Sequence, residues 1–517
     1  MAIVQHPSRA GRTVRGAVVG FVLASLASCG IDGGAASAPA RPNVVFILAD
    51  DLGFGDVAAL NPHSRLPTPN IDRLAAEGMT FTDAHSPSGV CTPTRYALLT
   101  GRYAWRTRLK SGVLWVDSPP LIEPGRATVA SVLARAGYRT GCVGKWHLGL
   151  GYGRDAAGKI DRSMPLNDGP TTHGFGSYFG IPASLDMAPY FYVEDLRVVG
   201  ALTAELPGVP FPGFMRKGAS SPEFSPVDCL DVLTGRALDF IADAADAAED
   251  GEPFFLYFPL SAPHKPVLPH PRFVGAAELG PYGDFVVQVD DTVGRVLAAL
   301  DEHGLEDDTL VIFSSDNGSF MHRRSADSGP DHSEDSSKQA FRETTHTSNG
   351  VFRGTKADIW EGGHHVPLLA RWPAAVEAGS SCDQTVCLVD TLATLAALAG
   401  EELPDGAGED SFDLSPLLLG RTQRVERASV VNHSAGGTFA LRDGPWKMIA
   451  GNGSGGREQP RGKPFARPYK LFDLASDPSE TTDLAAEHPD RVAEMEVVLE
   501  RLRSEGRSRP AAGDGGE

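Results

Sequence analysis

The segment Val44-Val-Phe-Ile-Leu-Ala49 is a continuous apolar run with no polar residue inside it. A short run of this kind is typical of a strand that is buried on both faces, as in a parallel sheet covered by helices. Two carboxylates, Asp50 and Asp51, follow the run directly. The segment therefore predicts a central strand that ends in two acidic side chains.

The rest of the chain alternates helical and strand-like segments around this strand. Helical patterns occupy residues 68–78, 92–99, 129–136, 232–248 and 282–303, and strand patterns occupy residues 138–143, 253–260 and 309–315. This alternation indicates an α/β fold with a large, mostly parallel sheet flanked by helices. We expect this catalytic domain to span residues 43–424.

The sequence pattern changes near residue 425, from long helices and strands to short strands. Short strands are expected at residues 429–432, 438–442, 447–449 and 470–472, and a helix at residues 490–505. These segments predict a smaller α+β C-terminal subdomain over residues 425–507, followed by a disordered tail at 508–517. Two polar inserts, residues 320–349 and 451–467, are long enough to be lids or pocket walls.

The first 29 residues have the features of an export signal. Three arginines precede a short apolar run, Ala17 to Ala27, and no acid occurs before Asp32. The run is too short to span a bilayer, and it closes on Leu26-Ala-Ser-Cys29, which resembles a bacterial lipoprotein signal. Lipidated Cys29 would then anchor an exported periplasmic or cell-surface protein through a flexible linker, residues 30–42. A plain secretory signal, or a protein with an apolar start, is the alternative.

The composition of the chain limits which molecules it can bind and which cysteines it can pair. The formal net charge of the 517 residues is -19, which argues against nucleic acid because phosphate binding needs clustered Lys and Arg. Of the six cysteines, Cys382 and Cys387 could close a small loop in an oxidising compartment, and Cys142 is expected to be a buried thiol.

A second strand also ends in oxygen donors. Asp316 and Asn317 follow the predicted strand 309–315 as Asp50 and Asp51 follow theirs. Alone, each pair could be a solvated turn. Together they supply three carboxylates and an amide at the sheet edge where ligands bind, a donor set that suits Ca²⁺ better than zinc.

The segment Cys91-Thr-Pro-Thr-Arg95-Tyr-Ala-Leu-Leu-Thr-Gly101 is the most informative motif. A Cys at a helix start lies in a positive local potential, and Arg95 lies one turn further on the same face. Those features alone would indicate a reactive thiol or a buried Cys before a helix.

Further candidates are Lys145 and His147, which alternation places on one side of an extended chain, and His264 and Lys356 in loops. A Lys and a His together suit a sulfate group. Read alone, however, each could be an ordinary solvated or half-buried side chain.

The whole set resembles the sulfatase family, whose signature Cys-x-Pro-x-Arg with a following Leu-Thr-Gly is matched at every fixed position. The resemblance implies that Cys91 is oxidised to formylglycine by a formylglycine-generating enzyme. It also implies that one Ca²⁺ is held by Asp50, Asp51, Asp316, Asn317 and the modified Cys91.

The remaining roles also come from the resemblance. Lys145 and Lys356 would bind sulfate, Arg95 would offset charge, His147 would contact the formylglycine hydrate, and His264 would protonate the leaving oxygen. Ser184 lies near a position where relatives have a polar contact to that oxygen. One hydroxyl of the hydrate would attack sulfur and the second would expel sulfate.

The chain departs from the family pattern at one place. After Ile359-Trp-Glu-Gly-Gly363 it has His364-His365, where many relatives have Arg before Val-Pro. His365 could change the edge of the pocket or only pack.

The predicted activity is hydrolysis of an aryl or, preferably, a carbohydrate sulfate ester. One alternative is a phosphomonoester or phosphonate hydrolase of the same superfamily. Another is an inactive surface protein that binds sulfated glycans, which should lack a nucleophile or metal ligand; none is missing here. The sequence does not choose a sugar.

Overall fold

The computed structural model describes residues 41–510 except residues 212, 250 and 428, and these residues belong to one compact unit, Pro39–Glu517. The predicted central strand is β1, Asn43–Asp50, and all of its residues are buried. β1 pairs in parallel with β10 (Phe254–Pro263) on one side and β11 (Thr309–Ser315) on the other. Its continuous apolar character follows from this central position.

The main sheet has ten strands in the order β15-β2-β14-β11-β1-β10-β4-β5-β6-β7. The centre, from β11 to β5, is parallel, whereas β14 joins β11 and β2 in antiparallel orientation, as β6 joins β5 and β7. The predicted α/β class is confirmed, and the outer strands make the sheet mixed. The strands not yet given are β2 (Met79–Phe81), β4 (Arg139–Lys145), β5 (Ser177–Ile181), β6 (Val193–Glu194), β7 (Arg197–Val198), β14 (Leu368–Arg371) and β15 (Ser380–Cys382).

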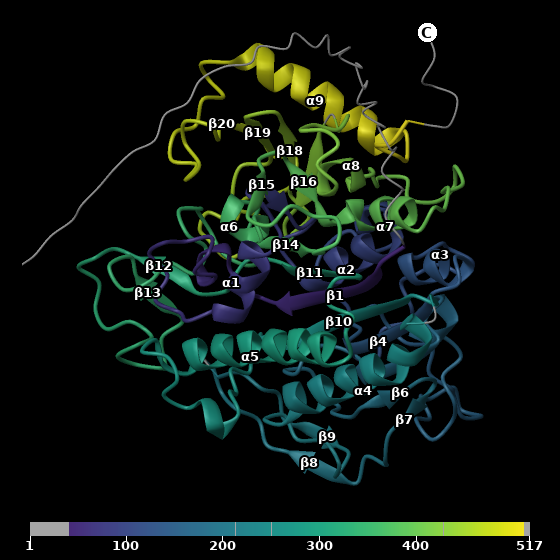
Figure 1. The fold of residues 1–517 in the computed structure, drawn as a ribbon. Coiled ribbons are helices and arrows are strands. Elements are labelled where there is room, and N and C mark those ends of the chain that lie inside the picture. The colour runs from purple at the N-terminus through teal and green to yellow at the C-terminus, as the bar shows by residue number, and fades with distance from the viewer. Residues whose placement is uncertain (1–40, 212, 250, 428, 511–517) are drawn as a thin grey trace, which may run out of the picture. The chain divides into compact units, whose positions relative to one another are not determined.

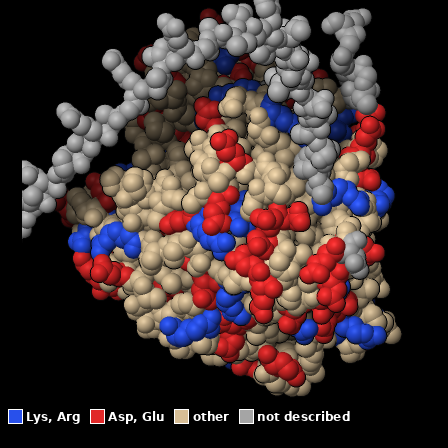
Figure 2. Space-filling model, in the orientation of Figure 1, with Lys and Arg blue, Asp and Glu red and all other residues tan. Residues whose placement is uncertain are grey.

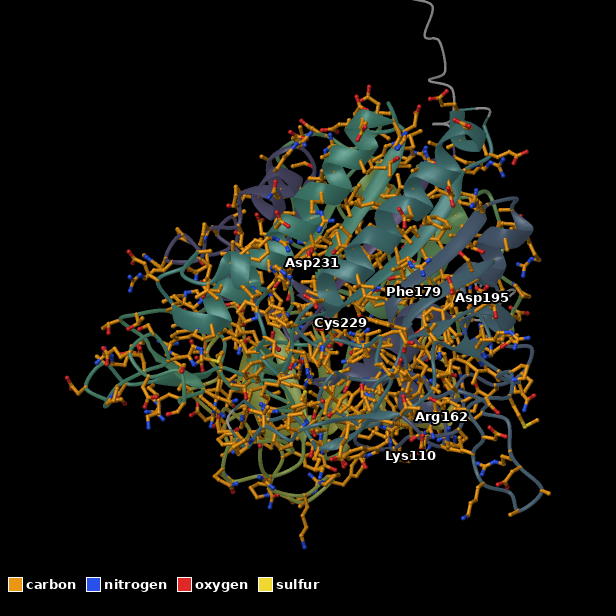
Figure 3. All side chains as sticks on the ribbon, turned by 90° about the horizontal axis from the view of Figure 1, so that it is seen from below. Lys110, Arg162, Phe179, Asp195, Cys229 and Asp231 are labelled. Atoms are coloured by element: carbon orange, nitrogen blue, oxygen red, sulfur yellow. The ribbon has the colours of Figure 1, made fainter. Side chains whose placement is uncertain are left out.

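Helices cover both faces of this sheet (Figure 1). Val45, Ile47 and Ala49 of β1 pack toward α1 (Pro69–Ala76), α4 (Cys229–Glu249) and α5 (Gly280–Glu302). The alternate residues Val44, Phe46 and Leu48 pack toward α2 (Cys91–Thr100), α3 (Val129–Arg135) and α7 (Thr391–Leu398). Figure 3 views the face covered by α4 and α5, with Cys229 and Asp231 labelled in the first turn of α4.

The C-terminal part forms a separate antiparallel sheet of four strands. These are β17 (Val430–His433), β18 (Phe439–Asp443), β19 (Trp446–Ala450) and β20 (Lys470–Asp473). Helix α9 (Pro489–Ser504) buries Met495 and Leu499 against Leu441 and Met448 of this sheet. The predicted α+β subdomain is present, while its boundary at residue 425 stays a prediction.

The remaining elements are short. The polar insert 320–349 contains the parallel pair β12 (His322–Arg324) and β13 (Ala340–Arg342). The others are β3 (Ala84–His85), β8 (Ala204–Leu206), β9 (Gly218–Ser220), β16 (Val386–Cys387), α6 (Glu361–His364), α8 (Ser415–Leu418) and 3-10 turns at Phe54–Asp56, Ala104–Arg106, Pro170–His173, Pro271–Phe273 and Leu388–Asp390.

The five cysteines in the described part of the chain are unbonded and buried. Cys382 pairs through β15 with β2, whereas Cys387 belongs to β16, so the two thiols are free in separate sheets. Cys29 and the predicted signal lie outside the described residues. Between residues 41 and 510, where described, no helix is long and apolar enough to cross a membrane. Acidic and basic side chains are interspersed on the face shown in Figure 2.

Candidate active site

The two strand ends meet as predicted. Asp316 continues from β11 and its backbone N–H donates to the Ala49 carbonyl of β1. The Asp51 N–H faces Asp316 Oδ1 at 3.3 Å, and Asn317 Nδ2 donates to Asp51 Oδ1 at 2.7 Å. The carboxyl ends of adjacent parallel strands thus bring three carboxylates and one amide together.

Cys91 is the first residue of α2 and is only 2% exposed. Its Sγ lies 3.7 Å from Asp50 Oδ1 and 3.5 Å from Lys356 Nζ. Burial, reinforced by the nearby Asp316 carboxylate, raises the pKa of the Cys91 thiol to about 12. The unmodified side chain is therefore a protonated thiol at neutral pH, which is a poor nucleophile.

Arg95, one turn into α2, is completely buried. Its Nε and Nη2 donate to Asp316 Oδ2 at 2.9 and 2.7 Å, and its Nη1 donates to the Lys145 carbonyl at 2.8 Å. Burial together with Asp50 raises the pKa of Asp316, and Arg95 counteracts this effect. The guanidinium thus fixes one oxygen of Asp316 and the end of β4.

Two lysines neutralise the adjacent aspartates. Lys145 Nζ, at the end of β4, lies 2.6 Å from Asp50 Oδ2. Lys356 Nζ contacts both oxygens of Asp51, at 2.6 and 2.8 Å. Burial opposes ionisation of Asp50, but the neighbouring cations, Lys145 foremost, hold its pKa well below the usual range. Both carboxylates are therefore ionised and paired.

His147 presents one bare ring nitrogen. Its Nε2 is 2.8 Å from the Leu114 carbonyl, so Nε2 carries the proton. Among the described residues, its buried Nδ1 has no hydrogen-bond partner. Burial and the positive charges of Lys145 and Arg95 lower the pKa of His147 well below its usual value. The imidazole is therefore neutral, with Nδ1 free to accept a proton.

His264 lies beyond β10, on the same edge of the sheet. Its Nε2 is 3.6 Å from Asp51 Oδ2, and its Nδ1 hydrogen-bonds the Lys265 carbonyl. Burial, together with Lys356, lowers the pKa of His264.

Ser184 lies on the loop after β5. Its hydroxyl is buried, and no group of the described chain forms a hydrogen bond with it. The structure therefore does not join Ser184 to the charged cluster by a hydrogen bond.

The oxygen donors of this cluster, rather than its sulfur and imidazole nitrogen, suit a hard cation. Ligand atoms of Asp50, Asp51, Cys91 and His264 lie within 4.8 Å of one another. Asn317 Oδ1 is buried and has no hydrogen-bond partner among the described residues. A buried carbonyl oxygen beside ionised carboxylates is the type of ligand that Ca²⁺ prefers. Asp51 (φ 68°) and His147 (φ 57°) also adopt left-handed backbone, a strain often found at functional sites.

Thr92 is a residue of the site that the sequence did not reveal. Its hydroxyl donates to the His147 carbonyl at 3.0 Å and accepts from the Leu114 N–H at 3.1 Å, so it ties His147 to the segment that orients its ring. Thr92 occupies a variable position of the Cys-x-Pro-x-Arg pattern, which gave no signal for this role.

His365, where the chain departs from the family pattern, packs inside the protein. Its ring stacks on Phe352 with centroids 3.8 Å apart, and its Nδ1 lies 3.2 Å from Glu361 Oε2. Its Nε2 lies 3.1 Å from the Thr82 carbonyl, so both ring nitrogens are engaged away from the Cys91 cluster. His365 therefore packs in the interior and does not form the edge of the pocket around Cys91.

Known proteins of similar sequence identify the family of this chain. The Sulfatase family profile matches residues 42–401. An N-acetylgalactosamine-6-O-sulfatase of Bacteroides thetaiotaomicron is 34% identical over 502 residues, covering 90% of this chain and 93% of its own. Arylsulfatase A of Homo sapiens is 34% identical over 485 residues, covering 89% and 87% respectively.

A solved structure, titled for the metabolism of multiple glycosaminoglycans by Bacteroides thetaiotaomicron, superposes with a TM-score of 0.78 at 32% identity, covering 90% of this chain and 99% of its own. The sequence and the structure are therefore both similar to those of known proteins over most of the chain. The chain belongs to the sulfatase family and is a hydrolase of sulfate esters.

Proposed function

We propose that this sulfatase removes sulfate from a carbohydrate, with a nucleophile derived from Cys91 by oxidation to formylglycine. The carbohydrate class is supported by the N-acetylgalactosamine-6-O-sulfatase, which is similar over 90% of this chain. We take the 6-sulfate of N-acetylgalactosamine as the first substrate to test.

The observation that carries the proposal is the convergence on Cys91 Sγ. An ionised carboxylate, Asp50, and an ammonium group, Lys356, both lie within 3.7 Å of the sulfur. A buried thiol with a raised pKa is badly suited to attack, whereas an aldehyde hydrate needs no thiolate. The surroundings thus favour a modified side chain, whose hydrate would supply one hydroxyl for attack and one for release of sulfate.

The cationic side chains would bind the sulfate oxygens. Lys145 and Lys356 reach the site from β4 and from the segment after the polar insert, and both are nearly excluded from water. Fixed positive charge in a buried site stabilises a transition state more than it would in water. Arg95 acts through Asp316 as a positioning residue.

Two histidines would move protons. His147 would accept a proton at Nδ1, because its Nε2 is committed to the Leu114 carbonyl. His264 would donate a proton from Nε2 to the departing sugar oxygen in its doubly protonated form, because Nδ1 already donates its own proton to the Lys265 carbonyl. The Asp51 carboxylate, 3.6 Å from Nε2, would favour this charged form against the effect of burial. Ser184 would contact the leaving-group side of the substrate through its hydroxyl, which has no hydrogen-bond partner among the described residues.

Asp50, Asp51, Asp316 and Asn317 would hold one Ca²⁺ together with the modified Cys91. When bound there, the ion would stabilise negative charge on the nucleophile and on sulfate oxygens. The unpartnered Asn317 Oδ1 and the ionised state of Asp50 support this assignment.

We also propose export, with Cys29 lipidated at the cell surface or in the periplasm and no other membrane attachment. The maturation partner would be a formylglycine-generating enzyme.

The decisive test is mass spectrometry of the peptide that contains Cys91, from protein made in a host with the modifying enzyme. We expect the aldehyde or its hydrate in place of the thiol, and multiple turnovers on N-acetylgalactosamine 6-sulfate with little activity on a matched phosphate ester. An unmodified thiol in fully active protein would disprove the formylglycine nucleophile. A preference for phosphate would instead favour the phosphohydrolase alternative.

A further inference from the structure

We propose that Lys265, His322 and Arg457 form a second anion site beside the sulfate site, which binds a carboxylate or a further sulfate on the same glycan. The proposal rests on the proposed function, since it assigns the part of the substrate beyond the scissile ester. We call these three residues the outer cationic cluster.

Lys265 directly follows His264 and is 9% exposed. Its Nζ lies 5.1 Å from the ring centroid of Phe320, 5.7 Å from that of Phe214, and 3.5 Å from Gln339 Oε1. Within the described residues, no carboxylate oxygen lies within 4.0 Å of this ammonium group. Aromatic faces and an amide therefore hold a nearly buried charge that lacks an anionic partner.

Arg457 comes from the second polar insert, residues 451–467. The insert is anchored next to the sulfate site, because the Arg457 and Glu458 N–H groups donate to Asp358 Oδ1, two residues beyond Lys356. The nearby Arg353 is neutralised by Glu458, with a closest contact of 2.5 Å. The guanidinium of Arg457, in contrast, forms no ion pair within the part of the chain that the structure describes.

His322 lies at the start of β12, in the first polar insert. Together with Arg324 and Thr355 it lines a cleft of about 800 Å³. The wall of this cleft also includes four acidic residues, Glu343, Asp358, Glu458 and Glu480. Thr355 immediately precedes Lys356, which contacts Cys91, so this wall of the cleft is one residue along the chain from the sulfate site. In this proposal, a glycan that carries its ester at Cys91 would extend toward this cleft and past His322.

The three groups influence one another. Burial, then the charges of Arg457 and Lys356, lower the pKa of Lys265 to about 8. Partial loss of hydration and the charge of Arg457 lower the pKa of His322, although this residue is exposed at the surface, and Lys265 contributes less. Asp51 and Asp186 act in the opposite direction on Lys265, as Asp358 does on His322, so these carboxylates offset part of the repulsion. A bound anion would offset the rest. A second anionic group on the substrate would do so and also gain charge-assisted hydrogen bonds.

The test compares three substrates with the full-length matured enzyme: N-acetylgalactosamine 6-sulfate, its 4,6-disulfate, and a 6-sulfated disaccharide with a neighbouring uronic acid. The last two distinguish a second sulfate from a carboxylate. The variants are Arg457→Met and His322→Gln. The control is Arg461→Met, an exposed arginine of the same insert.

We expect the wild-type enzyme to prefer one of the two dianionic substrates. Arg457→Met should reduce that preference, measured as a ratio of kcat/KM values, on the order of tenfold, which is the usual contribution of a charged hydrogen bond. His322→Gln should reduce it less, and Arg461→Met should retain it. Higher salt should also weaken the preference.

Equal loss on all three substrates, with lowered thermal stability, would mean that Arg457 is structural and would overturn the proposal. So would a wild-type enzyme that hydrolyses the monosulfate without preferring either second anion. Failure of the wild type on every sulfate ester would instead reject the proposed function, so the two failures are distinguishable.

Discussion

Two nitrogens of Arg95, Nε and Nη2, donate to the same oxygen of Asp316, at 2.9 and 2.7 Å. This leaves the other oxygen, Oδ1, to face the Asp51 N–H at 3.3 Å. The fork fixes which oxygen of Asp316 points toward the candidate cation site, and a lysine cannot reproduce it.

Arg95→Lys should therefore weaken calcium binding as well as turnover. We expect the Ca²⁺ concentration for half-maximal thermal stabilisation to rise about tenfold, since one charged hydrogen bond that orients a ligand is lost. Calcium-dependent melting curves of chelator-treated protein measure this effect directly. Arg102→Lys, outside the site, is the control, and an unchanged calcium dependence in Arg95→Lys would contradict a positioning role.

Cys91→Ser tests the nucleophile. The serine hydroxyl could attack sulfur once, but it lacks the second hydroxyl needed to expel sulfate. We expect multiple-turnover activity to fall by at least about 1,000-fold, with a sulfated serine detectable by mass spectrometry in the peptide that spans position 91. Sustained turnover by this variant would refute the two-hydroxyl scheme.

His264→Gln tests the proton donor. A sugar alkoxide needs a proton to leave, whereas a nitrophenolate does not. We expect kcat to fall about 100-fold or more on a sugar sulfate and less than about tenfold on nitrophenyl sulfate. Rates on both substrates at one pH give the comparison, and equal losses would argue for a different role.

Lys447 of β19 links the C-terminal sheet to the catalytic domain, and its substitution tests how much this link stabilises the fold. Its Nζ lies 2.9 Å from Glu361 Oε1 and 2.8 Å from Glu480 Oε1. Lys447→Met would leave two carboxylates buried without this cation and should cost about 3 kcal/mol in the free energy of unfolding. Chemical unfolding measures the loss, and the exposed Lys463→Met should show almost none.

Asp290 provides a pH-dependent stability test. Its carboxylate accepts from the Asn70 and Ile71 N–H groups at the start of α1, and burial raises its pKa to about 6. The unfolded value is about 3.9, so the folded state holds the proton more tightly. The protonated form of Asp290 therefore stabilises the folded state. This contribution is fully present below about pH 4 and is lost as the pH rises through about 6.

Asp290→Asn removes this titration. The stability of the variant relative to wild type should thus rise by about 2 kcal/mol between pH 4 and pH 7. Unfolding midpoints of both proteins at the two pH values give the difference, and a pH-independent difference would contradict the assignment.

Much of the site could be predicted because it follows from the sheet. Asp50 and Asp316 end two neighbouring parallel strands, and Lys145 ends a third, so their proximity follows from apolar runs and strand ends alone. The signature around Cys91 added the helix that begins at the same edge.

The parts that escaped prediction depend on distant packing. No local pattern indicates that Arg457 lies near Lys265, because the insert that carries Arg457 is positioned by Asp358. The antiparallel strand β14 and the buried position of His365 likewise depend on partners far away in the sequence. Ser184, expected near the leaving group, lies on a loop whose conformation the sequence does not determine.

The burial of Cys91 also limits when the proposed conversion to formylglycine could occur. Its sulfur is beneath Asp50 and Lys356, at the start of a helix that is buried along its whole length. An oxidising enzyme could not reach that sulfur in the folded chain, because Cys91 is only 2% exposed there. Conversion and folding would thus compete for the same nascent segment, and a chain that folds first would be permanently unmodified.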